Sequence, residues 1–234
     1  MMNFNFNISE LIFVMPELFL LAAISSILLF DLYVKEQFKK FTYHLSQLAL
    51  LITGLLAFNL IGESATIFSG TFVLDTLGST FKVFIAGFSI IALVYSRHYL
   101  SVHGLLRNEY FILALMSILG MLVMVSGHSL LTLYLGLEIM SLSLYALIAT
   151  ARDRAFAIEA ALKYFVLGAI ASGLLLYGMS MIYGITGNLD IAQIASFASL
   201  ATLEPQETLI LNFGLVFLVI RVAFKLGAVP FHMW

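Results

Sequence analysis

Long apolar runs separated by short polar breaks dominate the chain. An α-helix needs about 20 predominantly apolar residues to cross a bilayer, and seven stretches approach or exceed this length. These predicted spans are residues 11–33, 41–62, 74–97, 109–126, 129–150, 155–184 and 207–229. The sixth is longer than a bilayer requires, so we expect it to be tilted or to protrude at one end. The pattern therefore predicts an all-α, polytopic membrane protein with about seven transmembrane helices.

The fifth run, LTLYLGLEIMSLSLYALI at residues 131–148, carries a single carboxylate near its middle. On a helix, Tyr134, Glu138, Ser141 and Tyr145 follow one another at spacings of three or four residues, so the polar groups share one face. The other faces are apolar. We therefore expect the polar face to point into the protein.

The eleven lysines and arginines are distributed unevenly. Seven of them fall in the connections after the first, third and fifth spans, on one side of the membrane: Lys35, Lys39, Lys40, Arg97, Arg107, Arg152 and Arg154. The connections on the other side contain acidic residues but no lysine or arginine. By the positive-inside rule, we expect the amino terminus to face outward and the odd-numbered spans to run toward the cytoplasm.

The other four cations lie within predicted spans: Lys82, Lys163, Arg221 and Lys225. Each costs about 2.5 to 3.5 kcal/mol at the bilayer centre on the insertion scale, so each needs a partner or water. Glu138 and Lys163 lie at roughly the same depth on neighbouring antiparallel spans, and could pair, either as a structural link or as part of a function. Lys163 has a second candidate partner in Glu159, one turn earlier on its own helix.

Lys225 precedes a predicted break in the seventh span. Gly227 and Pro230 follow it within five residues, and proline cannot continue a helix without losing a backbone hydrogen bond. Irregular backbone at membrane depth is tolerated only where it is buried in protein or lines a wet cavity, so we expect Lys225 to contact water. The alternative is that the helix ends at the cytoplasmic interface and Lys225 reaches the head groups.

The sequence gives weaker grounds for a functional role of Lys82 and Arg221. Lys82 is close enough to the start of its span to extend toward the outer surface, which favours a structural role. Arg221 lies one helical turn before Lys225, and two cations on one face disfavour each other's charge; only the lysine can realistically lose its proton. A glutamate–lysine pair that forms and breaks changes the proton affinity of its lysine, which is a switch that a pump could use.

Composition agrees with a membrane location and narrows the chemistry. The 234 residues are 62% hydrophobic and 10% charged, with a mean hydropathy of +1.07, which a charged soluble surface could not give. The sequence has no cysteine, which excludes disulfides and thiolate-bound iron–sulfur clusters on these residues. No basic stripe indicates nucleic-acid binding. Between the sixth and seventh spans, Asp190 is placed to cap a short interfacial helix, IAQIASFASLA.

Three stretches carry a family signature: LYLGLEIMSLSLYALIA, ALKYFVLGAIASGLLLYGMSMIYGITG and FKLGAVPFHMW. They resemble the antiporter-like membrane subunits of respiratory complex I, most closely the subunit N group, the bacterial counterpart of mitochondrial subunit 2. The resemblance extends over essentially the whole chain. The VPFHMW ending distinguishes this group from its sister subunits, in which the equivalent segment is closer to PLHTW.

The resemblance implies a proton-moving subunit of NADH:quinone oxidoreductase in the bacterial inner (plasma) membrane, beside other antiporter-like and small helical membrane-arm subunits. It implies no cofactor in this chain, with NADH, FMN, iron–sulfur clusters and quinone bound elsewhere in the complex. It also implies proton-relay roles for Glu138, which communicates with the adjacent subunit, for Lys163, which pairs with it, and for Lys225, a central carrier on a broken helix. Arg221 and Lys82 match no functional position of the family.

The resemblance further implies an inverted-repeat fold built from two units of five helices. Residues 108–234 would form an incomplete first repeat, and residues 1–107 would form three peripheral helices. We therefore expect a truncated gene or a partial sequence, which alone should not translocate protons.

Three other functions stay open at this point. A cation/proton antiporter subunit of the multisubunit sodium/proton type shares the helix pattern. A seven-helix photoreceptor with a retinal Schiff base on Lys225 is disfavoured, because the only tryptophan is the last residue and Pro230 breaks the helix. The last alternative is a scaffold in which the buried ions are only packing pairs.

Overall fold

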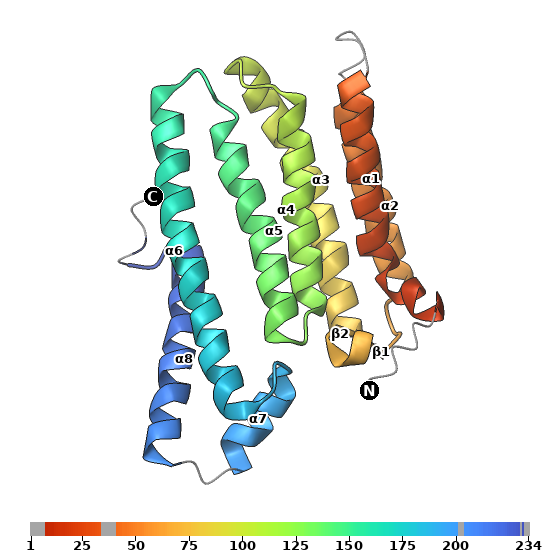
Figure 1. The fold of residues 1–234 in the computed structure, drawn as a ribbon. Helices are drawn as coiled ribbons and strands as arrows, with labels where there is room; N and C mark the ends of the chain where they lie inside the picture. The colour runs from red at the N-terminus through yellow and green to blue at the C-terminus, as the bar shows by residue number, and fades with distance from the viewer. Residues whose placement is uncertain (1–7, 34–40, 201–203, 230, 232–234) are drawn as a thin grey trace.

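The computed structural model describes residues 8–33, 41–200, 204–229 and 231, and shows a bundle of long helices (Figure 1). The long helices are α1 (Met15–Tyr33), α2 (Phe41–Asn59), α3 (Thr76–Val102), α4 (Asn108–Ser126), α5 (Leu130–Ala149), α6 (Ala155–Thr186) and α8 (Pro205–Lys225). The short elements are the 3₁₀ turns η1 (Ile8–Val14) and η3 (Phe68–Gly70), the strands β1 (Ala65–Ile67) and β2 (Phe72–Leu74), and the helix α7 (Ile191–Leu200).

Seven helices of the described chain are long and apolar enough to cross a membrane, which confirms the seven predicted spans. The seventh span was expected to reach residue 229, but α8 ends at Lys225. The reason is local: Gly227 has a φ of +63°, a left-handed conformation that commonly terminates helices. The helix therefore stops where the sequence places the start of the break, and Pro230 lies outside the described residues.

A small antiparallel hairpin, β1 with β2, fills the connection between α2 and α3. Strands of three residues are too short to show an alternating pattern, so the sequence gives no signal for them. Ile67 and Phe72 are buried in a cluster with Val14, and a bridge from Phe72 to Gly127 joins the hairpin to the end of α4. The hairpin thus closes one end of the first four helices.

Two helix pairs are joined by contacts between glycine backbones. In the pair α4 and α5, a Cβ placed on Gly120 would lie only 2.7 Å from the carbonyl oxygen of Gly136. In the pair α6 and α8, a Cβ on Gly178 would lie 2.7 Å from the carbonyl oxygen of Gly214. Glycine lets membrane helices approach closely in this way, so each pair is locked at one defined distance.

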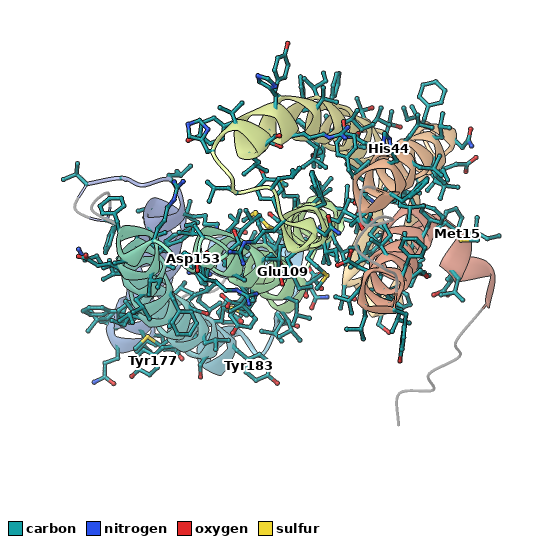
Figure 2. All side chains as sticks on the ribbon, turned by 90° about the horizontal axis from the view of Figure 1, so that it is seen from above. Met15, His44, Glu109, Asp153, Tyr177 and Tyr183 are labelled. Atoms are coloured by element: carbon teal, nitrogen blue, oxygen red, sulfur yellow. The ribbon has the colours of Figure 1, made fainter. Side chains whose placement is uncertain are left out.

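The connections α3–α4 and α5–α6 lie at the same end of the bundle (Figure 1). Two ion pairs join them there, Arg107 with Asp153 at 2.9 Å and Arg152 with Glu109 at 2.8 Å. Figure 2 shows this end from above, with Glu109 and Asp153 labelled. The grouping of these arginines on one side follows the sequence prediction, whereas Lys35, Lys39 and Lys40 lie outside the described residues.

The opposite end carries the predicted short helix, α7 (Figure 1). The Asp190 side chain accepts a hydrogen bond from the backbone N–H of Gln193 at 2.9 Å, as expected of a helix cap. Asp190 also forms a backbone bridge with Ser129, immediately before α5. The cap is therefore confirmed, and it fixes α7 against the start of the helix that carries Glu138.

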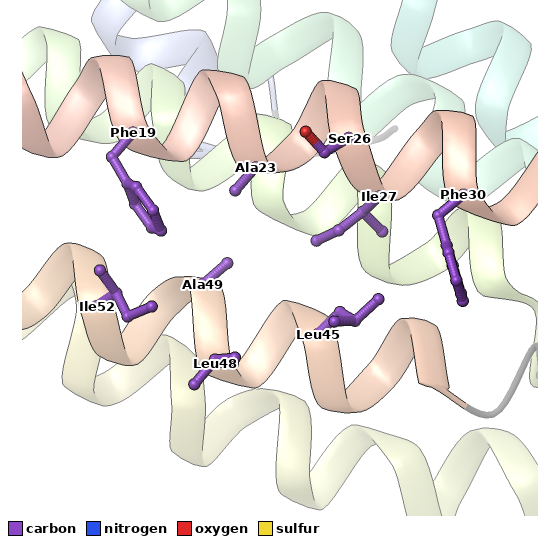
Figure 3. Close-up of a pocket in the computed structure, with 9 residues that line it drawn as sticks. All are labelled: Phe19, Ala23, Ser26, Ile27, Phe30, Leu45, Leu48, Ala49 and Ile52. Carbon is purple, nitrogen blue, oxygen red and sulfur yellow. The ribbon is translucent and has the colours of Figure 1, made fainter.

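An apolar groove lies along the contact between α1 and α2 (Figure 3). Its volume is about 310 Å³, and its lining is almost entirely hydrocarbon: Phe19, Ala23, Ser26, Ile27, Phe30, Leu45, Leu48, Ala49 and Ile52. None of these lining residues has an ionisable side chain that could carry a proton. The groove is accordingly not a candidate for the ion chemistry described below.

Lys82 does not extend to the outer surface, contrary to the sequence expectation. Its side chain is 1% exposed and forms an ion pair of 2.5 Å with Glu17 of α1, whose side chain is 5% exposed. The ammonium group also lies 4.9 Å from the centre of the Phe72 ring. The expectation failed because it considered only the reach of the lysine, whereas a buried carboxylate on α1 offers a nearer partner.

Removing either member of this pair should destabilise the protein. Lys82→Met leaves Glu17 as an uncompensated buried charge, so we expect the free energy of unfolding to fall by about 3 to 5 kcal/mol. The double variant Glu17→Gln/Lys82→Met should recover most of this loss. Thermal unfolding of the detergent-solubilised protein measures both effects, and a double variant as unstable as the single one would contradict the pairing.

Candidate functional site

Arg221 of α8 is the most deeply buried cation of the described chain, with an exposed fraction of 0%. Its Nη1 donates to the carbonyl oxygen of Gly168 on α6 at 3.0 Å. Its Nη2 donates to Glu138 Oε1 at 2.7 Å and to Ser141 Oγ at 3.1 Å, both on α5. One guanidinium group thereby ties together three helices.

Glu138 receives two hydrogen bonds on the same carboxylate oxygen. Besides Arg221, the hydroxyl of Ser172 on α6 donates to Oε1 at 2.7 Å. The Glu138 side chain is 19% exposed, so this carboxylate is held inside the bundle as the polar face of the fifth span predicted. Its ion pair with a guanidinium and its hydroxyl donor compensate much of the cost of removing it from water.

Lys225 lies at the end of α8, half-buried, with its amine directed at α5 and α6. Its Nζ donates to Ser141 Oγ at 3.0 Å and to the Tyr164 hydroxyl at 3.4 Å. Ser141 in turn donates to the backbone carbonyl of Leu137 at 2.5 Å. A hydroxyl has one donor and two acceptor sites. All three are occupied in Ser141, because its proton is donated to Leu137 and its oxygen accepts from Arg221 and from Lys225.

Lys225 lies partway along the length of the bundle. Its partner Tyr164 lies nine residues from the first residue of α6, Ala155, which corresponds to about 14 Å along the helix axis. Figure 1 agrees, because α8 ends partway along α6. The amine is directed inward at Ser141 and Tyr164, which favours an enclosed lysine over one that reaches the head groups.

Lys163 does not meet Glu138 in this structure. It pairs instead with Glu159 on its own helix, at 2.6 Å, with 58% and 61% of the two side chains exposed. Lys163 lies nine residues from Ser172, the α6 residue that contacts Glu138, which is about 14 Å along the axis and about half a turn away. The expected meeting assumed equal depth, whereas the long α6 is shifted relative to α5.

Two aromatic rings and two small residues shape the space around the charges. The rings of Tyr145 and Tyr164 meet edge to face, with centres 4.5 Å apart. A Cβ on Gly168 would approach Tyr145 Cζ to 2.5 Å, so only glycine leaves room for this ring. Gly168 therefore faces the site, as does Ser172, whose hydroxyl donates to Glu138.

Sequence reasoning placed Glu138 and Lys225 in the site but assigned no role to Arg221 or Ser172. A signal for Arg221 was present, because it lies one turn before Lys225 and a pair of acceptors, Glu138 and Ser141, lies one turn apart on α5. In the part of the chain that the structure describes, no three histidine, cysteine, aspartate or glutamate side chains gather as a metal site would require.

Known proteins resemble this chain in sequence and in fold. Residues 127–234 match the family described as NADH:quinone oxidoreductase/Mrp antiporter, transmembrane. NADH-quinone oxidoreductase subunit N of Ruthia magnifica subsp. Calyptogena magnifica is 68% identical over all of this chain and 49% of its own length. The protein of the same name from Halorhodospira halophila is 50% identical over 94% of this chain and 45% of its own. The chain thus spans about half the length of the curated relatives it matches.

The solved structures lead to the same fold. A chain of respiratory complex I from Thermus thermophilus superposes with a TM-score of 0.73 and 26% identity, over 94% of this chain and 46% of that one. A chain of the archaeal membrane-bound sulfane sulfur reductase superposes with a TM-score of 0.79 and 24% identity, over 95% and 46%. Because its identity is only 24%, the likeness to the sulfane sulfur reductase concerns the fold alone.

Proposed function

We propose that this chain acts in proton translocation by the membrane arm of respiratory complex I, because its residues 127–234 match the family described as NADH:quinone oxidoreductase/Mrp antiporter, transmembrane. The relatives at 68% and 50% identity are both named NADH-quinone oxidoreductase subunit N. These names favour complex I over the multisubunit sodium/proton antiporter.

The observation that supports proton translocation is the buried polar network formed by Glu138, Arg221, Ser141 and Lys225. Ionisable groups inside a membrane protein are costly and usually mark ion or proton paths. A lysine can release its proton when its surroundings change, which suits it to carry one. Lys225, close to the end of a helix at membrane depth, is therefore the proposed central carrier.

We assign the three relay roles as follows. Glu138 biases the charge on the lysines, Lys163 exchanges protons with Lys225 along a hydrated path, and Lys225 passes them on. Since Lys163 pairs with Glu159 on the outer face of α6, its exchange with Lys225 requires α6 to repack. Redox-driven changes in neighbouring subunits would cause that repacking.

The energy for pumping has to come from outside this chain. Moving one elementary charge against 100 mV costs about 2.3 kcal/mol, and the sequence has no cysteine that could hold a redox cluster. In our proposal NADH, FMN, iron–sulfur clusters and quinone react in other subunits. Adjacent antiporter-like and small helical membrane-arm subunits transmit the change to α5, α6 and α8.

We place the chain in the bacterial inner membrane with its amino terminus on the outer (periplasmic) side, because the arginines of the α3–α4 and α5–α6 connections share one end. We further propose that residues 1–107 are three peripheral helices and residues 108–234 belong to an antiporter-like repeat. The family match at 127–234 falls inside the second part.

Glu138→Gln in the assembled complex tests the relay. Glutamine keeps the oxygen that accepts from Arg221 and Ser172 but carries no charge, so the bias on the lysines is lost. A neighbouring opposite charge changes proton affinity by about 10- to 10³-fold, so we expect the initial rate of NADH-driven proton pumping to fall on the order of 10²-fold. Dye quenching in inverted membrane vesicles measures this rate, with complex content determined on native gels. Glu109→Gln, at an exposed ion pair, is the matched control. Unchanged pumping in Glu138→Gln would exclude the role assigned to this residue.

A further inference from the structure

Glu138 has a partner that cannot give up its charge. A guanidinium group stays protonated in proteins, and Arg221 contacts Glu138 at 2.7 Å with both groups inside the bundle. The lysine expected to pair with Glu138 faces the other way, on the exposed side of α6. The counter-ion of Glu138 in this chain is thus a permanent cation, whereas a lysine could exchange its proton.

The same guanidinium also contacts Ser141, whose hydroxyl oxygen accepts from both Arg221 and Lys225. Its hydroxyl proton is used on the Leu137 carbonyl, so both remaining acceptor positions receive cations. Any displacement of Arg221 changes what Ser141 offers to Lys225. Arg221 is therefore linked to the proposed proton carrier through one oxygen atom.

The fork shape of the side chain matters as much as its charge. The two Nη atoms reach Gly168 on α6 and Glu138 with Ser141 on α5 at the same time. A lysine at this position would bring a single ammonium group on a flexible stem and could not hold both helices in the same geometry. The arrangement thus combines charge compensation with precise placement.

We propose that Arg221 is a positioning residue of the relay: it is the fixed counter-ion of Glu138, and it holds Ser141 so that Lys225 is the cation of α8 that carries the exchangeable proton. This inference rests on the proposed function. It follows that Lys163 is not the counter-ion of Glu138. Its proposed role is to exchange protons with Lys225.

The first test asks which cation compensates Glu138. In the assembled complex, Glu138→Gln leaves a buried cation unpaired, and we expect the content of assembled complex on native gels to fall. Adding Arg221→Met should restore the content, whereas adding Lys163→Met should not. Restoration by Lys163→Met and not by Arg221→Met would overturn the assignment of the counter-ion.

The second test separates positioning from charge compensation. Arg221→Lys keeps a cation beside Glu138, so assembly should be retained. The loss of the fork should lower the initial rate of proton pumping on the order of 10²-fold, as a misplacement near 1 Å can do. Ser141→Ala should give a similar loss, and the double variant should lose no more than either single variant, because both changes act through the same contact.

The outcomes distinguish this inference from the proposed function. Normal pumping in Arg221→Lys and Ser141→Ala, together with lost pumping in Glu138→Gln, would overturn the positioning role and leave the relay intact. Normal pumping in Glu138→Gln as well would reject the relay itself. Additive losses in the double variant would show that Arg221 and Ser141 act separately, which also contradicts the proposal.

Discussion

Lys225→Ala should reduce NADH-driven proton pumping on the order of 10²-fold, the effect expected when a proton-transfer group is removed. Alanine deletes the amine that contacts Ser141 and Tyr164 at 3.0 and 3.4 Å and leaves the end of α8 otherwise unchanged. The measurement is dye quenching in inverted vesicles that contain the assembled complex, with NADH oxidation recorded in parallel.

Lys225→Arg makes this prediction more discriminating. Arginine keeps the positive charge and the hydrogen bonds but is not deprotonated in proteins, so we expect pumping to be lost to a similar extent. A structural cation would tolerate the exchange. Pumping close to that of the unmodified complex in Lys225→Arg would therefore show that the residue is not a carrier, even if Lys225→Ala were inactive.

Gly214→Leu should separate α8 from α6 and thereby disrupt the site from a distance. A Cβ on Gly214 would lie 2.8 Å from Ile182 Cγ1 and 3.0 Å from the Gly178 carbonyl oxygen. Overpacking of a tight contact costs about 1 to 3 kcal/mol, occasionally more. Arg221 lies two turns further along the same face of α8, so its bond to the Gly168 carbonyl should lengthen and pumping should fall.

Val219→Leu is the matched control, because Val219 is 64% exposed on the outer face of the same helix. It adds a methylene group where nothing is displaced, and both complex content and pumping should stay at the level of the unmodified protein. The thermal midpoint of the purified complex reports the stability difference. Equal midpoints for Gly214→Leu and Val219→Leu would contradict the close packing of α6 and α8.

The spans were predictable because a bilayer imposes one length and one composition on every crossing helix. The break after Lys225 was predictable for a related reason, since the conformational freedom of Gly227 is a property of that residue alone. The cap at Asp190 was equally local. Each of these features depends on residues that are neighbours in the sequence, so the pattern contains the necessary information.

The pairing of charges was less predictable because it depends on how helices are shifted and rotated against each other. Depths counted from the span ends placed Lys163 beside Glu138, but a difference of nine residues along α6 turns a side chain to the opposite face. Lys82 was misjudged for the same reason, since its partner Glu17 comes from a helix distant in sequence. No periodicity in one segment specifies the rotation of another.

The two glycine contacts determine where movement within this bundle can occur. The backbones of α4 and α5 are in close contact at Gly120 and Gly136, and those of α6 and α8 at Gly178 and Gly214, so neither pair can move closer together. The contacts of Arg221 with Glu138 and Ser141, and of Lys225 with Ser141, cross the remaining seam, between these two rigid units. A slide of one unit against the other would shear the charged contacts together while leaving both apolar interiors intact, so a mechanical input from a neighbouring protein could be delivered to the ions without unfolding any helix.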